Sequence, residues 1–132
     1  ALQKEYDIQL AVFELNSALD YEEIPMKNLT DLKLMFPSTT KVVSTSSEIL
    51  FEKQYKKINN ITPNANEKKG FDVTFDTLLR ICQEEGFAAS ASTIKTEYVE
   101  SGFDYNSVNG LISNDASYLL YYDNDLTIKQ VQ

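Results

Sequence analysis

The spacing of apolar residues early in the second half of the chain most constrains how the sequence folds. Apolar side chains recur there at intervals of three and four residues, at Phe75, Leu78, Leu79 and Cys82. This is the period of one face of an α-helix. Thr74 can cap such a helix and Gly86 can end it. We therefore predict an amphipathic helix over residues 74–86, with Cys82 buried on its apolar face as a structural thiol.

The residues around this helix predict further short elements. Residues 71–73 form a short extended stretch, and the β-branched and aromatic residues of 87–105 predict one or two strands. Asn106 or Ser107 can cap a second helix over residues 107–116. The two apolar runs after it, 118–122 and 126–131, are joined by Asp and Asn and therefore predict a β-hairpin.

The first half of the chain has weaker signals. Residues 1–20 carry apolar side chains at helical spacing and therefore predict an amphipathic helix, with a strand over residues 6–13, where apolar residues also alternate, as the alternative. A short helix is predicted over 28–37, ended by Pro37. Residues 46–58 form a further predicted helix, because the preceding Thr45 and the Glu48 that follows it make a capping box.

Residues 59–70 have the composition of a connecting loop, being polar and containing both Pro63 and Gly70. We place a boundary at their end. The predicted fold class is α+β, in which a small two-layer βαββαββ unit spans residues 70–132. A mainly helical N-terminal segment or subdomain, residues 1–69, precedes it.

Size and charge restrict the function classes. The chain has 132 residues, enough to bury roughly two thirds of its unfolded surface. Its net charge of −8 repels phosphate backbones and anionic membranes, so nucleic acid is not an expected partner. No run of apolar residues is long enough to span a membrane. No signal peptide is recognisable, so the segment is either cytoplasmic or has lost a targeting or anchoring region.

The chemistry available to the chain is limited by the absence of histidine. Ser-His-Asp and Cys-His catalysis and histidine-bound zinc are thereby excluded. No glycine-rich phosphate loop or metal-binding motif is present, so we expect no cofactor and no metal site. The carboxylate pairs Glu84 with Glu85 and Asp123 with Asp125 keep a carboxylate-dependent hydrolase as an alternative. Helix-end and turn positions explain both pairs without catalysis.

Residues 71–131 resemble the small domain at the periplasmic N-terminus of secretins, which signalling TonB-dependent receptors share. The segment 75–87 is similar to the first helix of that domain and its glycine stop. The segments 107–112 and 118–128 are similar to its second helix and closing hairpin. A baseplate hub protein of a contractile-tailed phage contains a similar module. The resemblance implies a structural, non-enzymatic role in an oligomeric envelope assembly.

From this resemblance we expect a non-enzymatic protein–protein interaction domain of a bacterial pilus or secretion assembly in the periplasm. Its partners would be protein subunits, with homo-oligomer formation in the full-length context. A phage tail baseplate hub domain is the structural alternative. Aromatic side chains are enriched at protein interfaces, and the rims of interfaces are polar. The candidate interface therefore comprises Tyr98, Phe103, Tyr105, Tyr121, Tyr122, Asp123 and Asp125.

Overall fold

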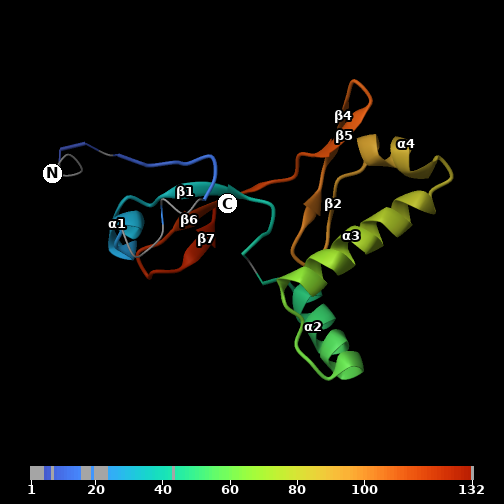
Figure 1. Cartoon of the computed structure of the whole chain (residues 1–132), viewed down its shortest axis with the longest axis horizontal. Coiled ribbons are helices and arrows are strands. Elements are labelled where there is room, and N and C mark those ends of the chain that lie inside the picture. The colour runs from blue at the N-terminus through green and yellow to red at the C-terminus, as the bar shows by residue number, and fades with distance from the viewer. Residues whose placement is uncertain (1–4, 7, 16–18, 20–23, 43, 132) are drawn as a thin grey trace. The chain divides into compact units, whose positions relative to one another are not determined.

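The computed structural model describes residues 5–6, 8–15, 19, 24–42 and 44–131, and we restrict structural statements to them. Helices and antiparallel strands are both present, which confirms the predicted α+β class (Figure 1). The chain divides into two compact units. One combines residues 1–38 with 118–132 and is called the discontinuous unit; the other, residues 39–117, is called the central unit.

The discontinuous unit is built on a three-stranded antiparallel sheet. Strand β6 (Tyr118–Tyr122) lies between β1 (Met35–Ser38) and β7 (Ile128–Gln130). Helix α1 (Met26–Asp31) precedes β1 and contacts β6. The β6–β7 pair confirms the predicted hairpin, in which the N–H of Asp123 donates to the carbonyl of Thr127 at 2.9 Å.

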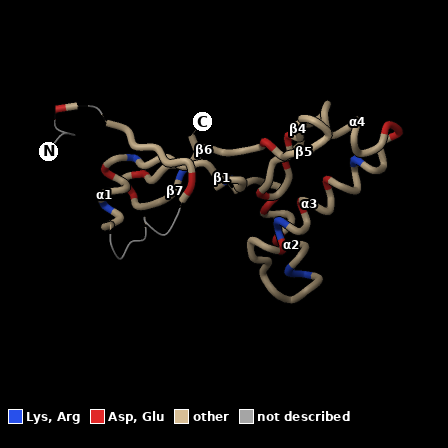
Figure 2. The backbone as a smooth tube through the Cα atoms, turned by 45° about the horizontal axis from the view of Figure 1, so that its top comes forward, with Lys and Arg blue, Asp and Glu red and all other residues tan. Residues whose placement is uncertain are grey.

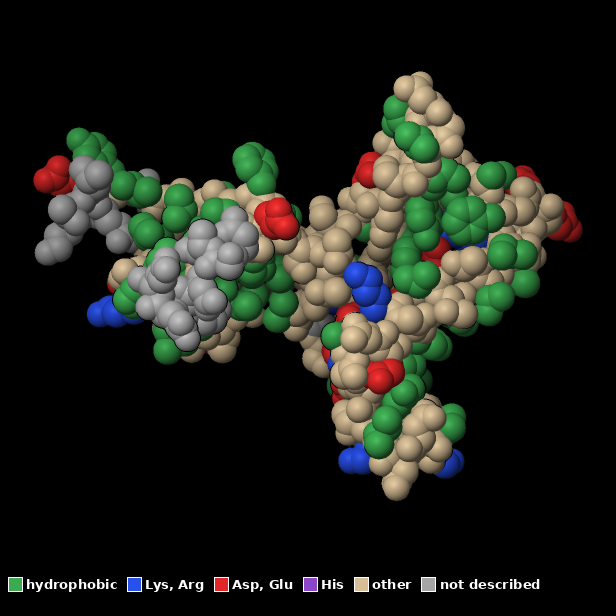
Figure 3. Space-filling model, in the orientation of Figure 1, with side chains coloured by type: hydrophobic (Ala, Val, Ile, Leu, Met, Phe, Trp, Pro, Cys, Tyr) green, Lys and Arg blue, Asp and Glu red, His purple; other side chains and the backbone are tan. Residues whose placement is uncertain are grey.

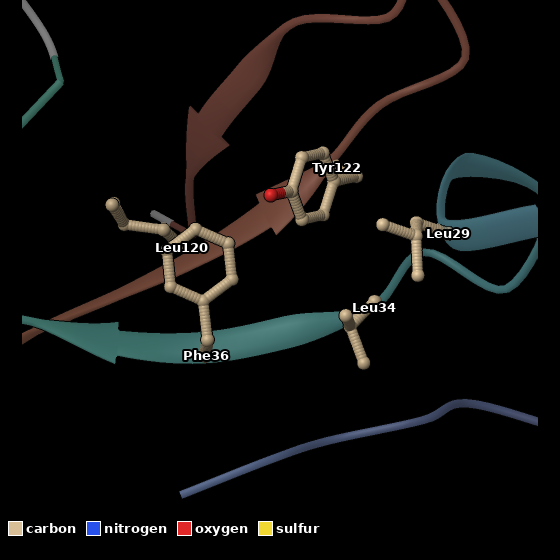
Figure 4. Packing of buried hydrophobic residues seen from close by; sticks show 5 residues of the cluster. All are labelled: Leu29, Leu34, Phe36, Leu120 and Tyr122. Atoms are coloured by element: carbon tan, nitrogen blue, oxygen red, sulfur yellow. The ribbon is translucent and has the colours of Figure 1, made fainter. Parts of the chain in front are cut away.

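The core of this unit joins residues from distant parts of the sequence. Phe36 of β1 lies opposite Leu120 of β6, and its ring centroid is 5.5 Å from that of Tyr122. Leu29 and Leu34 complete the buried cluster (Figure 4). Because side chains alternate along a strand, Leu120 and Tyr122 face this core while Leu119 is exposed.

The predicted helix over residues 1–20 is wrong where the structure describes it. Met35 exchanges two backbone hydrogen bonds of 2.9 Å, one with Leu10 and one with Val12, so this segment runs extended beside β1. The strand alternative over residues 6–13 is therefore closer to the structure. The rest of that prediction, at residues 1–4, 7, 16–18 and 20, lies outside the described residues.

The helix predicted over residues 28–37 is only partly present. It ends at Asp31, and Lys33 takes a positive φ of 45°, which turns the chain into β1. Pro37 lies within β1 instead of ending a helix. Proline cannot donate a backbone hydrogen bond, so it is tolerated in a strand only where that donor is not needed.

The central unit begins with two helices. Helix α2 (Ser46–Asn59) confirms the predicted helix over 46–58, and the Thr45 hydroxyl accepts a hydrogen bond from the N–H of Glu48 at 3.3 Å. Helix α3 (Ala65–Ile81) begins nine residues before the predicted start, at a capping box formed by Asn64 and Glu67. The predicted extended stretch at 71–73 and the predicted domain boundary at 69/70 both fall inside α3.

Short elements follow α3. Helix α4 (Gly86–Thr93) begins at a glycine with φ +74° and occupies the start of a region predicted to form strands. Strands β2 (Thr96–Glu97) and β3 (Gly102–Phe103) pair with each other after it. Alanine is common in α4, and alanine favours helix over strand.

The predicted helix over residues 107–116 is wrong, and with it the βαββαββ order. The segment forms a β-hairpin from β4 (Tyr105–Val108) and β5 (Leu111–Asn114). Asn109 and Gly110 both take positive φ angles, 53° and 80°. Asn-Gly with positive φ at both residues makes the two-residue turn that suits a right-twisted hairpin. In the part of the chain described, no helix is both long and apolar enough to span a membrane.

Candidate functional site

One side of α3 displays a row of exposed apolar side chains. We call it the α3 stripe and define it as Phe71, Phe75, Leu78, Leu79 and Cys82. Leu78 is 56% exposed, Leu79 42%, and both phenylalanines 39%. Figure 3 shows hydrophobic side chains on the surface over α2 and α3. The spacing of the stripe is that of a single helix face.

The buried side of α3 is polar. Asp72, Asp76 and Arg80 follow one another at intervals of four residues and are 0%, 0% and 3% exposed. We call these three residues the polar triad. The amphipathic pattern of the helix is thus reversed with respect to burial. The sequence identified the helix and its apolar face, but the face predicted to be buried is the exposed one.

Asp72 binds the turn between β2 and β3. Its carboxylate accepts three consecutive backbone N–H groups, from Val99, Glu100 and Ser101, each at 2.9 Å. Buried backbone donors must be satisfied, and a carboxylate can accept several at once. Asp72 therefore ties α3 to this turn through main-chain contacts.

Asp76 lies at the centre of a buried hydrogen-bond network. Its Oδ2 accepts from Arg80 Nε at 2.7 Å, and its Oδ1 accepts from the hydroxyls of Thr96 at 2.6 Å and Tyr98 at 3.1 Å. Burial alone would raise the pKa of Asp76. The hydrogen bonds from Arg80 and Thr96 outweigh that effect and hold the pKa below its usual value, so Asp76 stays ionised.

Arg80 connects α3 to α4. Its Nη1 donates to the carbonyl of Ser90 at 2.7 Å, and its Nη2 donates to the carbonyl of Ile94 at 3.0 Å. These carbonyls lie at the C-terminal end of α4, and that of Ser90 also accepts from the backbone N–H of Ile94 at 3.2 Å. The guanidinium carbon also lies 4.9 Å from the ring centre of Tyr105. The polar triad thus sets the rotation of α3 and keeps the stripe facing outward.

Aromatic rings run from α2 through α3 to α4 in a row of successive contacts. Neighbouring ring centres are 4.6 to 5.9 Å apart. Phe71 and Phe75 of the stripe lie in the middle of this row, so the stripe is supported from beneath by packed rings. In order, the rings are those of Tyr55, Phe51, Phe71, Phe75, Tyr98, Phe103, Tyr105 and Phe87.

The residues predicted to form one interface belong to different units. Tyr98, Phe103 and Tyr105 lie in the central unit, and Tyr121, Tyr122, Asp123 and Asp125 lie in the discontinuous unit. Phe103 and Tyr122 are only 5% and 4% exposed, so their side chains belong to cores. Tyr98 and Tyr105 are half-buried, and burial raises the pKa of both phenols.

Asp123 and Asp125 serve the turn between β6 and β7. Both carboxylates pair with Lys129. The hydrogen bond from Lys129 lowers the pKa of Asp123; hydrogen bonds from Thr127 and then Lys129 lower that of Asp125 to about 2. A carboxylic acid that acts as a general acid requires a raised pKa, whereas the pKa values of Asp123 and Asp125 are both lowered. Among the described residues, no group of three or more Cys, Asp or Glu side chains is placed to hold a metal ion.

Cys82 is exposed, so the prediction of a buried structural thiol is wrong. It follows the last residue of α3, on the side of the stripe and away from the polar triad. We expect the native protein to react fully with a thiol reagent such as DTNB, because reactivity requires access to the sulfur. The stoichiometry should be one thiol per chain without denaturant. A reaction that begins only when the chain is unfolded would contradict this geometry.

Two signals could have located this site from the sequence. Asn64 and Glu67 have the spacing of a capping box, which would have moved the start of α3 to its observed place. The polar triad repeats every four residues, which indicates a shared helix face but not its burial.

Comparison with protein-family models, with curated proteins and with solved structures gives no significant match.

Proposed function

We propose that this chain is a non-enzymatic protein–protein interaction domain whose contact surface is the α3 stripe. The observation that carries the proposal is the reversed burial of α3, in which apolar side chains face solvent and charged ones are buried. Contiguous exposed apolar surface on a folded unit is typical of a binding site for another protein. Burial of such side chains is the main favourable term in association.

The spacing of the stripe favours a helix that docks into a groove. Phe71, Phe75, Leu78 and Cys82 recur at intervals of four, three and four residues. Helices that bind grooves present their anchors at this spacing. The polar triad holds α3 in one rotation before binding, which lowers the entropic cost of docking. The partner surface is therefore an apolar groove of about helix width.

We extend the proposal to a setting, a bacterial pilus or secretion assembly in the periplasm. This part rests on the sequence resemblance of residues 71–131 to secretin N-terminal domains. Segment 118–128 contains a hairpin, as the resemblance requires. Segment 75–87 contains the end of α3, but α3 ends at Ile81 and Gly86 begins α4, where the resemblance requires a glycine that ends the helix. Segment 107–112 is a hairpin where the resemblance requires a helix. The partner in this setting is a neighbouring envelope subunit.

Site-specific cross-linking in the native organism tests both parts. A photo-reactive benzoylphenylalanine at position 78 should cross-link to pilus or secretion subunits. The same residue at position 73 should not, because Val73 is 44% exposed on a face of α3 away from the stripe. Equal cross-linking at both positions, or none at position 78, would contradict the proposal. Recovery of phage tail proteins at position 78 would keep the stripe and replace the envelope setting with the tail baseplate.

A charge in the stripe should separate binding from folding. Leu78→Asp is expected to abolish the cross-linked partner complex, because an unpaired carboxylate would enter an apolar groove. The free energy of unfolding should change by about 0.5 kcal/mol or less, since Leu78 is exposed. Val73→Asp, at an exposed apolar residue on another face of α3, serves as the control and should retain the complex. Loss of folding in Leu78→Asp would show that the stripe is part of a core.

A further inference from the structure

The β4–β5 hairpin carries no charge in an otherwise strongly charged chain. Residues 105–114 contain no Asp, Glu, Lys or Arg, whereas these make up 24% of the sequence. Residues 106–114 are all exposed, and the tip of the hairpin carries neither charge colour in Figure 2. The turn at that tip, Asn109-Gly110, is the sole Asn-Gly pair in the sequence. A chemical change at this turn would therefore alter a neutral, exposed surface.

The backbone nitrogen that follows Asn109 is open to attack on its side chain. Asparagine is chemically labile, because its side-chain carbonyl carbon can react with the backbone nitrogen of the next residue. Glycine has no Cβ to shield that nitrogen. Apart from the neighbouring residues, no heavy atom lies within 4 Å of the place that a Cβ would take on Gly110. The two reacting groups are therefore adjacent and unobstructed.

Hydrogen bonds do not hold either reacting group. In a two-residue turn the carbonyl of the residue before the turn accepts from the N–H of the residue after it, here Val108 and Leu111. The N–H of Gly110 lies outside this pattern. Within the described part of the chain, neither that N–H nor the Asn109 carboxamide forms a hydrogen bond.

Asn114, at the end of the same hairpin, is exposed but held by its partners. Its Oδ1 accepts from the N–H of Asp104 at 2.8 Å, and its Nδ2 donates to the carbonyl of Gly102 at 2.9 Å. The residue after it, Asp115, has a charged side chain that shields its own nitrogen. Asn114 therefore serves as an internal control for Asn109.

The exposed tip can reach the reactive conformation. The ring that the reaction forms requires rotation about the Cα–C bond of Asn109, so the turn must open first. Helix α4 packs on β4, but every residue of β5 is exposed. Segments with few buried contacts open at the lowest cost in free energy. Transient opening of the tip is therefore sufficient, and the rest of the central unit stays folded.

We propose that Asn109 is a modification site, at which the native chain converts asparagine to aspartate and isoaspartate without an enzyme. The Gly110 nitrogen loses its proton to water and attacks Cγ of Asn109. The new C–N bond forms, the Cγ–Nδ2 bond breaks, and ammonia leaves with a proton from water. Water then opens the resulting five-membered imide at either carbonyl carbon, which yields aspartate or isoaspartate. No oxidant or reductant is needed.

Both products change the hairpin. Each places the first negative charge within residues 105–114, in addition to the net charge of −8 that the chain already has. Aspartate leaves the main chain unaltered and, like asparagine, suits the first position of this turn. Isoaspartate routes the main chain through the side-chain carbon and adds one methylene. The two-residue turn that pairs Val108 with Leu111 is then lost, because turn length fixes the register of a hairpin.

Incubation of the full native chain at mildly alkaline pH, followed by peptide mapping in a mass spectrometer, tests the proposal. Trypsin releases residues 96–129 as one peptide, and fragmentation of this peptide distinguishes Asn109 from Asn114. Asn109 should exchange its NH₂ for OH at least about tenfold faster than Asn114, because only the nitrogen after Asn109 lacks a neighbouring Cβ. A protein isoaspartate methyltransferase should methylate the incubated chain and not the fresh chain.

Gly110→Ala tests the role of the open nitrogen. Its conversion is measured in urea, where strain at the positive φ of Gly110 has no influence, and should be slower than that of the unfolded native sequence by about tenfold or more. Leu78→Asp should convert at the native rate, because the reaction does not involve the α3 stripe. This inference and the proposed function therefore fail independently.

Three results would overturn the inference. Equal rates at Asn109 and Asn114 would show that Gly110 gives no advantage. Conversion of Asn109 in urea but not in the native chain would show that the closed turn protects it. A gain of mass without methylation would show that water attacks the amide directly, with no ring.

Discussion

Replacing Asp72 with Asn should lower the free energy of unfolding by about 3 kcal/mol or more. The carboxylate of Asp72 is fully buried and accepts three backbone N–H groups at 2.9 Å. An amide keeps one oxygen but turns an NH₂ group toward the remaining donors, which are then buried without a partner. Urea unfolding followed by far-ultraviolet circular dichroism measures the effect, because α2, α3 and α4 all lie in the central unit.

The matched control for this change is Asp115→Asn. Asp115 is exposed and accepts a hydrogen bond from the Ser113 hydroxyl. Its replacement should change the free energy of unfolding by about 0.5 kcal/mol or less. If Asp72→Asn is as mild as this control, the carboxylate does not organise the turn between β2 and β3. The rotation of α3 would then need another cause.

Replacing Arg80 with Ala should cost about 3–5 kcal/mol, the usual effect of removing one partner of a buried ion pair. The change leaves the buried carboxylate of Asp76 without its cation, and it removes the guanidinium hydrogen bonds to the carbonyls of Ser90 and Ile94. Lys69→Ala, an exposed cation on the same helix, is the control and should be nearly neutral. The same unfolding measurement applies.

The coupling between the two side chains is measurable. Asp76→Ala with Arg80→Ala should cost less than the sum of the two single changes, because each single change leaves a charge unpaired in the interior. Strict additivity would mean that the 2.7 Å contact between Nε and Oδ2 contributes no energy.

Protonation of Asp76 should make the free energy of unfolding fall as the pH is lowered. Its pKa is lower in the folded chain than the ordinary value of 3.8. The stabilisation that ionised Asp76 contributes to the folded chain is therefore complete above pH 3.8, and it is lost as the pH falls through the lower pKa that Asp76 has in the folded chain. The stability difference between the native chain and Asp76→Asn should be largest near neutral pH and shrink below about pH 4. A difference that grows on acidification would contradict this assignment.

Elements with strong local signals were predictable. The cap at Thr45 and the apolar spacing after it identified α2, and two apolar runs with an Asp-Asn turn identified the β6–β7 hairpin. The Asn109-Gly110 pair was an equally local hairpin signal. The helix predicted there rested on apolar spacing, which a short segment can satisfy in either conformation. The turn residues decided between the two.

The candidate site was predictable only in part. The apolar spacing of Phe75, Leu78, Leu79 and Cys82 located the helix and the residues that share one face. Their exposure could not be inferred, because the pattern assumes that apolar faces are covered. Asp72 has backbone partners 27 to 29 residues away, and backbone groups leave no mark in a sequence.

Local signals in the sequence were enough to predict the α+β class, the helical segments 46–58 and 74–81, and the closing hairpin. Capping, turn formation and helix propensity act within a few residues, so these features are encoded where they occur. The tertiary structure was needed to show that β1 pairs with β6, with partner residues 80 to 86 positions apart, and that α3 buries its charged side. Both depend on contacts between segments far apart in the chain, and hydrogen bonds supplied by those segments make a buried aspartate stable.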